Sequence, residues 1–264
     1  MAGTKKIRGS TILVVLLVLV VVFMASNNST CLRIISYNSN GMGAGRYEYI
    51  NRLMRECNIL LLQEHWLLDS QLDKLRLNIN NVNVHAISGM EANELLVGRP
   101  YGGLAILWKC DLQCHIEPIY TKSKRLCAVM LKSAGLEVAI FNVYMPTENN
   151  LSTDVYESTL CEISSICEQL DTPFFIQGGD YNVDFQRQQS KHTRVLKNFI
   201  EKESLICGLD VNRQLSEMDN KVEYTYESKV NNSFTLIDHM IMSHNLAEHM
   251  TLQGTTFPLQ IIHL

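Results

Sequence analysis

The sequence lacks paired cysteines, a dominant charge and internal repeats, and each absence excludes a class of protein. None of its eight cysteines forms a Cys-x-x-Cys pair or a zinc-ribbon spacing, so no thiol metal site is indicated. The formal net charge is -4, which gives no global basic field for nucleic acid. With 46% hydrophobic and 19% charged residues, and no low-complexity segment or long linker, the 264-residue chain is typical of a globular enzyme.

The N-terminal segment differs from the rest. Lys5, Lys6 and Arg8 precede an uninterrupted apolar run from Ile12 to Ala25, whose length fits a signal-peptide core better than a full span. Bulky residues stand where a small residue should precede a cleavage site. Residues 1–30 are therefore interpreted as an uncleaved signal anchor, with a cleaved signal peptide as the alternative. Either would place the protein in the secretory pathway or in a membrane as a single-pass protein. A buried core helix is less favoured, because the run has no polar face.

After residue 30, strand-like and helix-like patterns alternate in one domain, residues 31–264. Helices are expected over 47–56, around the apolar stripe that runs from Tyr156 to Leu170, and around Leu196 to Ile200. The last apolar runs predict one hairpin across Asn231 and Asn232. Strands are expected over 32–38, 58–64, 82–88, 103–109, 115–121, 125–144 as a hairpin, and 173–177. Many strands with few helices predict an α+β sandwich rather than a parallel sheet.

Polar residues collect at the ends of these strands. Each has a structural interpretation as a turn, a cap or a strand-end acid. Together, carboxylates and amides at strand ends are what a Mg²⁺-dependent phosphodiesterase requires, since the hard cation takes oxygen ligands. The residues are Asn38, Asn40, Glu64, Tyr144, Asp180, Asn182 and Asp238.

Six motifs occur in an order that is recognisable: SYNSNGM, LLLQEHW, YGGLAILWK, FNVYMPT, FIQGGDYNVDF and LIDHMIMS. They resemble the motif series of the endonuclease/exonuclease/phosphatase superfamily, and most of all the endonuclease domains of LINE-type (non-LTR) retrotransposons and apurinic endonucleases. The resemblance covers about residues 31–250. The resemblance implies a four-layer α/β/β/α sandwich with two packed mixed β-sheets. It also implies Mg²⁺ or Mn²⁺ as the cofactor, with no small-molecule cofactor. DNA would be the substrate, and the location would be nuclear. The secreted deoxyribonuclease, sphingomyelinase and inositol-phosphatase branches typically carry histidine at the position of Tyr144. Tyrosine followed by Pro146 resembles the apurinic and retrotransposon pattern, which favours DNA cleavage over hydrolysis of lipid or inositol phosphates.

The resemblance also implies roles for single residues. Glu64 would ligate the cation with Asn38 nearby, and Asp180 would orient or deprotonate the attacking water. Asn182 and Tyr144 would donate hydrogen bonds to the scissile phosphate. Two further residues complete the set: Asp238 would orient a catalytic histidine, and Asn40 stands where many relatives have an acidic or amide residue.

The C-terminus departs from the family pattern. The family closes with Ser-Asp-His before a strand, whereas this chain has Thr255 and Thr256 at the matching positions, with His263 further on. The final strand is therefore interpreted as truncated or degenerate, and loss of one phosphate donor would lower the rate about 10² to 10³-fold. Two alternatives follow: a catalytically dead domain of the same fold, as a gene remnant or nucleic-acid-binding module, and a membrane-tethered phosphodiesterase. The sequence does not define an oligomeric state.

Other histidines and aromatics are given structural interpretations. His239, His244 and His249 are five residues apart, which fits no zinc motif, so they are expected in the core or on the surface. Trp66 and Trp108 are interpreted as core or rim aromatics rather than base-stacking platforms.

Overall fold

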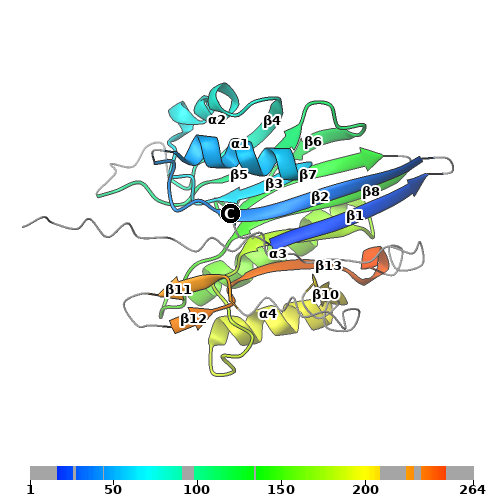
Figure 1. The fold of residues 1–264 in the computed structure, drawn as a ribbon. Helices are drawn as coiled ribbons and strands as arrows, with labels where there is room; N and C mark the ends of the chain where they lie inside the picture. The colour runs from blue at the N-terminus through cyan, green and yellow to red at the C-terminus, as the bar shows by residue number, and fades with distance from the viewer. Residues whose placement is uncertain are drawn as a thin grey trace, which may run out of the picture.

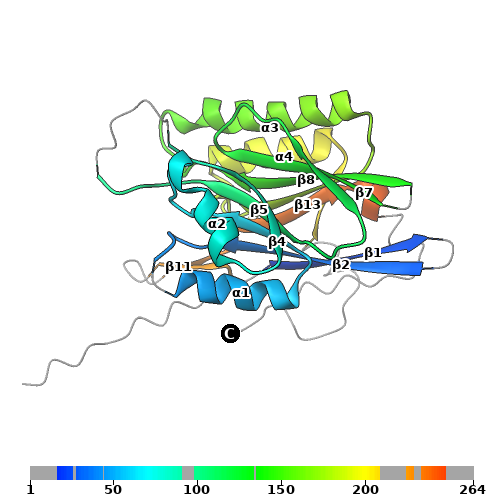
Figure 2. The ribbon, with the colours of Figure 1, turned by 90° about the horizontal axis from the view of Figure 1, so that it is seen from above.

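Two β-sheets packed face to face form the centre of the molecule, with helices on the outer face of each (Figure 1, Figure 2). The computed structural model describes residues 17–25, 28–43, 45–90, 98–133, 135–208, 224–228 and 233–247. The predicted four-layer α/β/β/α sandwich is confirmed. Both sheets are mixed, because each contains one parallel pair, β2 with β3 and β8 with β9, among antiparallel pairs.

The first sheet has five strands in the order β1-β2-β3-β5-β4. Two helices, α1 (Arg46–Glu56) and α2 (Asp73–Asn78), pack apolar side chains on its outer face. A short 3₁₀ turn at Asp69–Gln71 precedes α2. The strands are β1 (Leu17–Ala25), β2 (Asn28–Asn38), β3 (Ile59–Gln63), β5 (Leu104–Lys109) and β4 (Val82–Ile87). All five residues of β3 are buried, as its uninterrupted apolar sequence predicts for a central strand.

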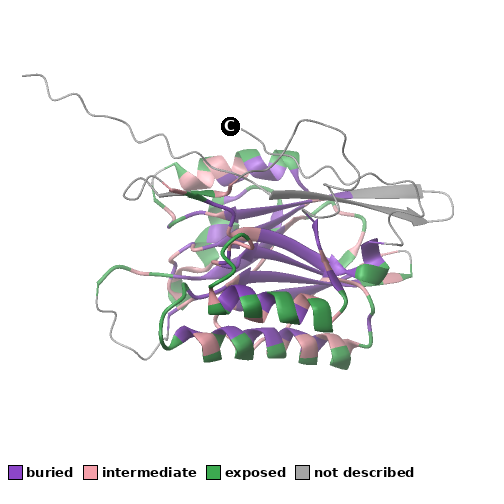
Figure 3. Cartoon of the chain, turned by 90° about the horizontal axis from the view of Figure 1, so that it is seen from below, coloured by how far each residue is buried: buried purple, intermediate pink, exposed green. Residues whose placement is uncertain are grey.

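The second sheet has six strands in the order β10-β13-β9-β8-β7-β6. Helices α3 (Ser152–Leu170) and α4 (Lys191–Lys202) cover its outer face, with buried residues on the side of each helix that faces the sheet and exposed residues on the side that faces solvent (Figure 3). The strands are β10 (Leu205–Cys207), β13 (Asp238–Ser243), β9 (Phe175–Asp180), β8 (Leu136–Tyr144), β7 (Leu126–Ser133) and β6 (His115–Ile119). Helix α4 begins where the Ser190 hydroxyl accepts a hydrogen bond from the Thr193 N–H at 3.0 Å.

The inner faces of the two sheets share one apolar core. Leu61 and Ile106 of the first sheet, and Val129, Ile140 and Met240 of the second, belong to it and are almost fully buried. Burial of this surface is the main favourable contribution to folding. It also fixes which ends of the strands lie together, and so determines where a site can form.

The predicted C-terminal hairpin forms, but its second strand ends at Thr235 instead of continuing to Ser243. The chain forms a small two-stranded sheet from β11 (Tyr226–Ser228) and β12 (Ser233–Thr235), and then a separate strand, β13, which joins the six-stranded sheet beside β9. The hairpin lies next to the start of β13 (Figure 1). Residues after 247, including Thr255, Thr256 and His263, lie outside the described residues.

The N-terminal apolar run gives a strand where a membrane anchor or signal peptide was expected. Residues Leu17–Ala25 form β1, which pairs antiparallel with β2 from Leu17 opposite Ser36 to Ala25 opposite Asn28. Among the described residues, no helix has the length and apolar character needed to cross a bilayer. The expected transmembrane segment therefore has no support in the structure. The rest of the predicted leader, residues 1–16, lies outside the described residues.

Candidate active site

The register of the strands brings the predicted site residues to one edge of the sandwich. Parallel strands end at the same edge, so Tyr144 at the end of β8 lies opposite Asp180 at the end of β9. β13 runs antiparallel to β9 and begins at that edge, which places Asp238 opposite Asp180. Asn38 ends β2 beside the end of β3, and Glu64 follows directly. Five residues that are far apart in the sequence therefore meet.

Asn38 connects the two sheets through its side-chain amide. Its Nδ2 donates hydrogen bonds to Oε1 of Glu64 at 2.8 Å and to Oδ2 of Asp180 at 3.0 Å, and its Oδ1 accepts the backbone N–H of Asn40 at 3.0 Å. The reverse orientation of the amide would face its oxygen toward two carboxylates. Asn38 thus uses both of its donor hydrogens to hold two acids together, while Oδ1 keeps one lone pair.

Asn40 contributes its backbone rather than its side chain. It adopts a left-handed conformation with φ 47°, and its side chain is exposed. Within the described part of the chain, that side chain forms no hydrogen bond. Asn40 was predicted to match a position where relatives have an acidic or amide residue. In the described structure, its contribution is the backbone hydrogen bond to Asn38.

Glu64 is held by its neighbours on both sides. One oxygen, Oε1, accepts from Asn38, and the other, Oε2, accepts the indole N–H of Trp66 at 3.0 Å. Both Glu64 and Trp66 have positive φ angles, 54° and 57°, in a region that side chains of this size rarely adopt and that costs on the order of 1–3 kcal/mol each. The backbone conformation at these two residues brings the Trp66 indole next to the Glu64 carboxylate.

His65, between them, secures the backbone. Its ring is fully buried, Nδ1 accepts the N–H of Leu67 at 3.0 Å, and Nε2 lies 3.1 Å from the carbonyl of Ile87. Because the backbone N–H can only donate, the ring proton is on Nε2 and is donated to Ile87. Burial lowers the pKa of His65 to about 4, so the ring is neutral at physiological pH.

The two glycines before Asp180 allow close packing of strands. A Cβ on Gly179 would lie 2.0 Å from the carbonyl oxygen of Val143, and φ at Gly179 is 147°. A Cβ on Gly178 would meet the side chains of Leu61 and Met240 at 2.5–2.6 Å. Gly179 therefore lets the end of β9 approach the β8 backbone closely enough to present Asp180, whereas a Cβ at Gly178 would meet only the ends of two flexible side chains, which can shift.

Asp180 and Asn182 form a compact turn after β9. The Asn182 N–H donates to Oδ1 of Asp180 at 2.9 Å, and its Nδ2 donates to the carbonyl of Met145 at 2.8 Å. Asn182 has φ 51°, which asparagine tolerates better than most residues. One Nδ2 hydrogen of Asn182 is left for another acceptor.

The electrostatics of the site are dominated by acids. Burial and the neighbouring Asp238 raise the pKa of Asp180 well above its usual range, against the hydrogen bonds from Asn182 and Asn38. Loss of hydration likewise raises the pKa of Asp238 to about 7, against a hydrogen bond from the Thr225 side chain. Among the described residues, neither these two acids nor Glu64 forms an ion pair.

Tyr144 and Arg125 complete the described site. Burial, followed by the charges of Glu64 and Asp180, raises the pKa of Tyr144, so its hydroxyl keeps its proton. The Arg125 guanidinium lies 5.7 Å from the centre of the Tyr144 ring, and its Nη1 donates to the Tyr144 carbonyl at 3.2 Å. No motif in the sequence singles out Arg125.

The donor set fits a hard divalent cation. Carboxylate oxygens of Glu64 and the free lone pair of Asn38 Oδ1 are ligands of the kind that Mg²⁺ takes. Within the described ranges, no three His, Cys, Asp or Glu side chains converge closely enough to hold an ion by themselves. A cation here would therefore complete its shell with water and phosphate oxygens, as Mg²⁺ commonly does.

Among the described residues, Asp238 hydrogen-bonds to Thr225. Its backbone N–H donates to the Thr225 hydroxyl at 3.1 Å, as does that of Ile237, so this threonine ties the hairpin to the start of β13. The histidine that Asp238 would orient falls in the segment after 247. His239 is buried, with Nε2 2.7 Å from the Val183 carbonyl, which confirms its core interpretation.

Sequence reasoning overlooked Trp66 and Thr225. Trp66 was interpreted as a core or rim aromatic, although its indole N–H bonds directly to Glu64. The only signal in the sequence is its position two residues after the acid. Thr225 has no motif of its own and could be found only from the pairing of the hairpin.

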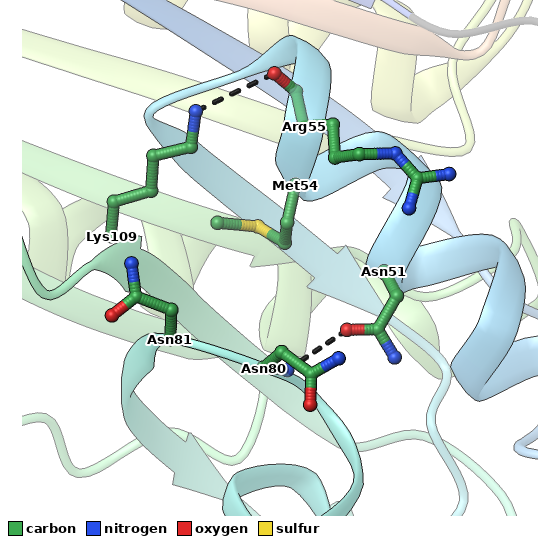
Figure 4. Close-up of a pocket in the computed structure, with 6 residues that line it drawn as sticks. All are labelled: Asn51, Met54, Arg55, Asn80, Asn81 and Lys109. Carbon is green, nitrogen blue, oxygen red and sulfur yellow. Dashed lines mark hydrogen bonds between the residues drawn. The ribbon is translucent and has the colours of Figure 1, made fainter.

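A separate cavity of about 420 Å³ lies near the start of β3, away from the strand ends that carry Glu64 (Figure 4). The C-terminal half of α1 and the turn before β4 form its walls. Its lining residues are Asn51, Met54, Arg55, Asn80, Asn81 and Lys109. None of them belongs to the predicted site, so the cavity is not part of it.

Comparisons with known proteins agree with this arrangement. The model of the Endonuclease/Exonuclease/phosphatase family matches residues 35–257. The endonuclease domain of TRAS1, a telomere-specific non-LTR retrotransposon, is similar in fold: TM-score 0.56, 16% identity, with 81% of this chain and 85% of that chain covered. The AP endonuclease LMAP from Leishmania major has TM-score 0.61 and 17% identity, with 81% of this chain and 80% of that chain covered.

A third similar structure is the 3' phosphatase NExo from Neisseria, bound to a product DNA hairpin. It has TM-score 0.57 and 17% identity, with 82% of this chain and 88% of that chain covered. At such identities the likeness establishes the fold alone. A search of curated proteins found no match.

Proposed function

The chain belongs to the endonuclease/exonuclease/phosphatase family, and we propose that it hydrolyses phosphodiester bonds of DNA with the help of a bound divalent cation. The observation that carries this proposal is the cluster at the strand ends, where Asn38 bridges Glu64 and Asp180. DNA as the substrate is supported by similar structures that are a retrotransposon endonuclease domain and a phosphatase bound to a DNA hairpin.

Glu64 would hold Mg²⁺ or Mn²⁺, with Asn38 beside it. When bound, the cation would neutralise part of the charge that builds up on the phosphate. Three acids lie together here without an ion-pair partner in the described residues, and burial raises the pKa values of Asp180 and Asp238. A bound cation would favour the charged forms of these carboxyl groups. The cation would also offset the electrostatic repulsion between these carboxylates and the phosphate of a substrate.

Asp180 would orient the attacking water and accept its proton as the water oxygen bonds to phosphorus. The bond from phosphorus to the leaving oxygen breaks, and that oxygen keeps the electron pair and takes a proton from solvent. The second Nδ2 hydrogen of Asn182 and the hydroxyl of Tyr144 would donate to phosphate oxygens as their negative charge increases. Asn38 keeps Asp180 and Glu64 at a fixed separation throughout.

Nicking of supercoiled plasmid by the full chain with Mg²⁺ tests this function. Asp180→Asn should reduce the rate at least about 10²-fold, the usual contribution of a positioned base, and Glu64→Gln should abolish metal-dependent nicking. Glu157→Gln, which removes a charge from the exposed face of α3, should cleave as the parent does. Equal rates for all four proteins would contradict the proposal.

Binding without cleavage is the second candidate. It is favoured by the threonines at 255 and 256, where the family motif has Asp-His. In that case the folded full chain would retain DNA in a gel-shift experiment but would nick plasmid no faster than Asp180→Asn. The same pair of measurements therefore separates a weakened enzyme from a binding domain.

A further inference from the structure

We propose that Trp66 is a positioning residue for the cation site: its indole N–H fixes the orientation in which Glu64 presents its carboxylate. The inference rests on the proposed function, in which Glu64 holds a divalent cation. Its basis is the hydrogen bond of 3.0 Å from Nε1 of Trp66 to Oε2 of Glu64.

The Glu64 carboxylate is held from two sides. Asn38 Nδ2 donates to Oε1 at 2.8 Å and Trp66 Nε1 donates to Oε2, so rotation about the last side-chain bond would break both hydrogen bonds. Each oxygen retains lone-pair capacity for another partner. Without the indole N–H, Asn38 and the Tyr144 hydroxyl would be left to restrain a side chain that has three rotatable bonds. Partners of this kind, one step away from a metal, commonly set its affinity.

The Trp66 ring is itself fixed in place. A Cβ on Gly41 would lie 2.3 Å from Cε3 of Trp66, so the ring lies directly against the glycine backbone. The Arg99 guanidinium lies 4.9 Å from the ring centre. The backbone is held by hydrogen bonds from Trp66 N–H to the Gly102 carbonyl at 2.9 Å and from Gly41 N–H to the Glu64 carbonyl at 2.7 Å.

A purely structural role would need only the shape of the ring. Packing against Gly41 and contact with Arg99 use the faces of the indole, whereas the hydrogen bond to Glu64 uses its edge. Trp66→Phe keeps an aromatic ring in this space and removes the N–H. The chain supplies a matched control, because its other tryptophan, Trp108, lies in β5 and packs against the core between the sheets.

The hydrogen bond can be tested without any metal. Two indole N–H resonances are expected in the ¹H–¹⁵N spectrum of the full chain, and Trp108→Phe assigns them. Glu64→Gln replaces the charged acceptor with an amide of similar shape, so the Trp66 indole proton should shift upfield while that of Trp108 stays unchanged. An unmoved Trp66 resonance would overturn the inference, whatever the protein cleaves or binds.

The positioning role is then tested by Mn²⁺ binding, followed as loss of the free-ion signal in electron paramagnetic resonance. Trp66→Phe should weaken binding about 10 to 100-fold, Trp108→Phe should leave it unchanged, and Glu64→Gln should remove it. If the parent binds and Trp66→Phe binds equally well, the positioning role is overturned and the cation site stands. If the folded parent does not bind Mn²⁺, the metal-dependent function fails, and the positioning role fails with it.

Discussion

The side-chain Nε2 of Gln63 donates a hydrogen bond of 2.6 Å to Oδ1 of Asn142, across the interface between the two β-sheets. The Nδ2 of Asn142 in turn donates to the carbonyls of Leu62 and Ala105 in the opposite sheet, at 2.9 Å and 2.8 Å. Both side chains are fully buried. Gln63 directly precedes Glu64, so this connection sets how the acid of one sheet lies relative to Asp180 of the other.

Replacing Asn142 with leucine should therefore destabilise the fold. The substitution removes the Asn142 amide from the buried carbonyls of Leu62 and Ala105 and takes one of three acceptors from the Gln63 amide, at a cost on the order of 3 kcal/mol. The free energy of unfolding in urea measures the effect. Asn83→Leu, at an exposed position of β4, serves as the control and should change that free energy by less than about 0.5 kcal/mol. Similar losses in both variants would show that the buried connection contributes little.

Gly179→Ala should be strongly destabilising. Its Cβ would lie 2.0 Å from the Val143 carbonyl oxygen, and the positive φ adds strain, which together cost about 3 kcal/mol or more. Gly43→Ala is the matched control, because nothing lies within 4 Å of a Cβ at that position. Thermal unfolding of both variants decides the matter. A Gly179→Ala protein as stable as Gly43→Ala would mean that β8 and β9 can separate without loss.

If the proposed cation site is correct, Mg²⁺ should stabilise the fold, because that site exists in the native chain and not in the unfolded one. At a free concentration of one hundred times its Kd, the free energy of unfolding should rise by about 2.7 kcal/mol. Chelation with EDTA should reverse the gain. Glu64→Gln should gain nothing, whereas Glu157→Gln should gain as much as the parent. Stabilisation of Glu64→Gln would place the ion elsewhere.

His192 should make stability depend on pH. Its ring is fully buried, with Nε2 3.0 Å from the Ser152 hydroxyl and the tilted Tyr156 ring 4.3 Å away between ring centres. Burial lowers the pKa of His192 below its usual 6.5, although the charge of Glu148 and a hydrogen bond to the Pro146 carbonyl act in the opposite direction. The unfolded chain thus binds the proton more readily.

The contribution of neutral His192 is consequently complete above about pH 6.5 and is lost as the pH falls below that value. Unfolding free energies at pH 7.5 and pH 5 should differ more in the parent than in His192→Gln, since other buried histidines contribute equally to both. An identical pH dependence in the two proteins would contradict a buried neutral ring at this position.

The sequence predicted most of the site because its chemistry lies at strand ends. Asn38, Glu64, Tyr144 and Asp180 follow or close apolar runs, and the register of parallel strands then brings them together. The N-terminal run could not be assigned in the same way. An uninterrupted apolar segment is equally compatible with a membrane span and with a buried strand, and only its partner strand distinguishes them.

Trp66 and Thr225 could not be predicted for a different reason. Their roles depend on backbone conformation and on pairing between distant segments. The positive φ angles at Glu64 and Trp66 direct both side chains to one point, and no periodicity in the sequence encodes that. The division of the last apolar runs into β12 and β13 likewise depends on the free edge of β9.

The pairing of β1 with β2 has a consequence for how the chain can be handled. β1 occupies the outer position of the five-stranded sheet, where its backbone covers the edge of β2. A bilayer-inserted segment would have to leave this position, because the same backbone groups cannot serve a transmembrane helix and a sheet at once. Truncation or insertion would then expose a long, unpaired strand, a template for association between copies of the chain. Solubility of a variant that begins after residue 27 would thus report whether β1 is needed to cover the edge of β2.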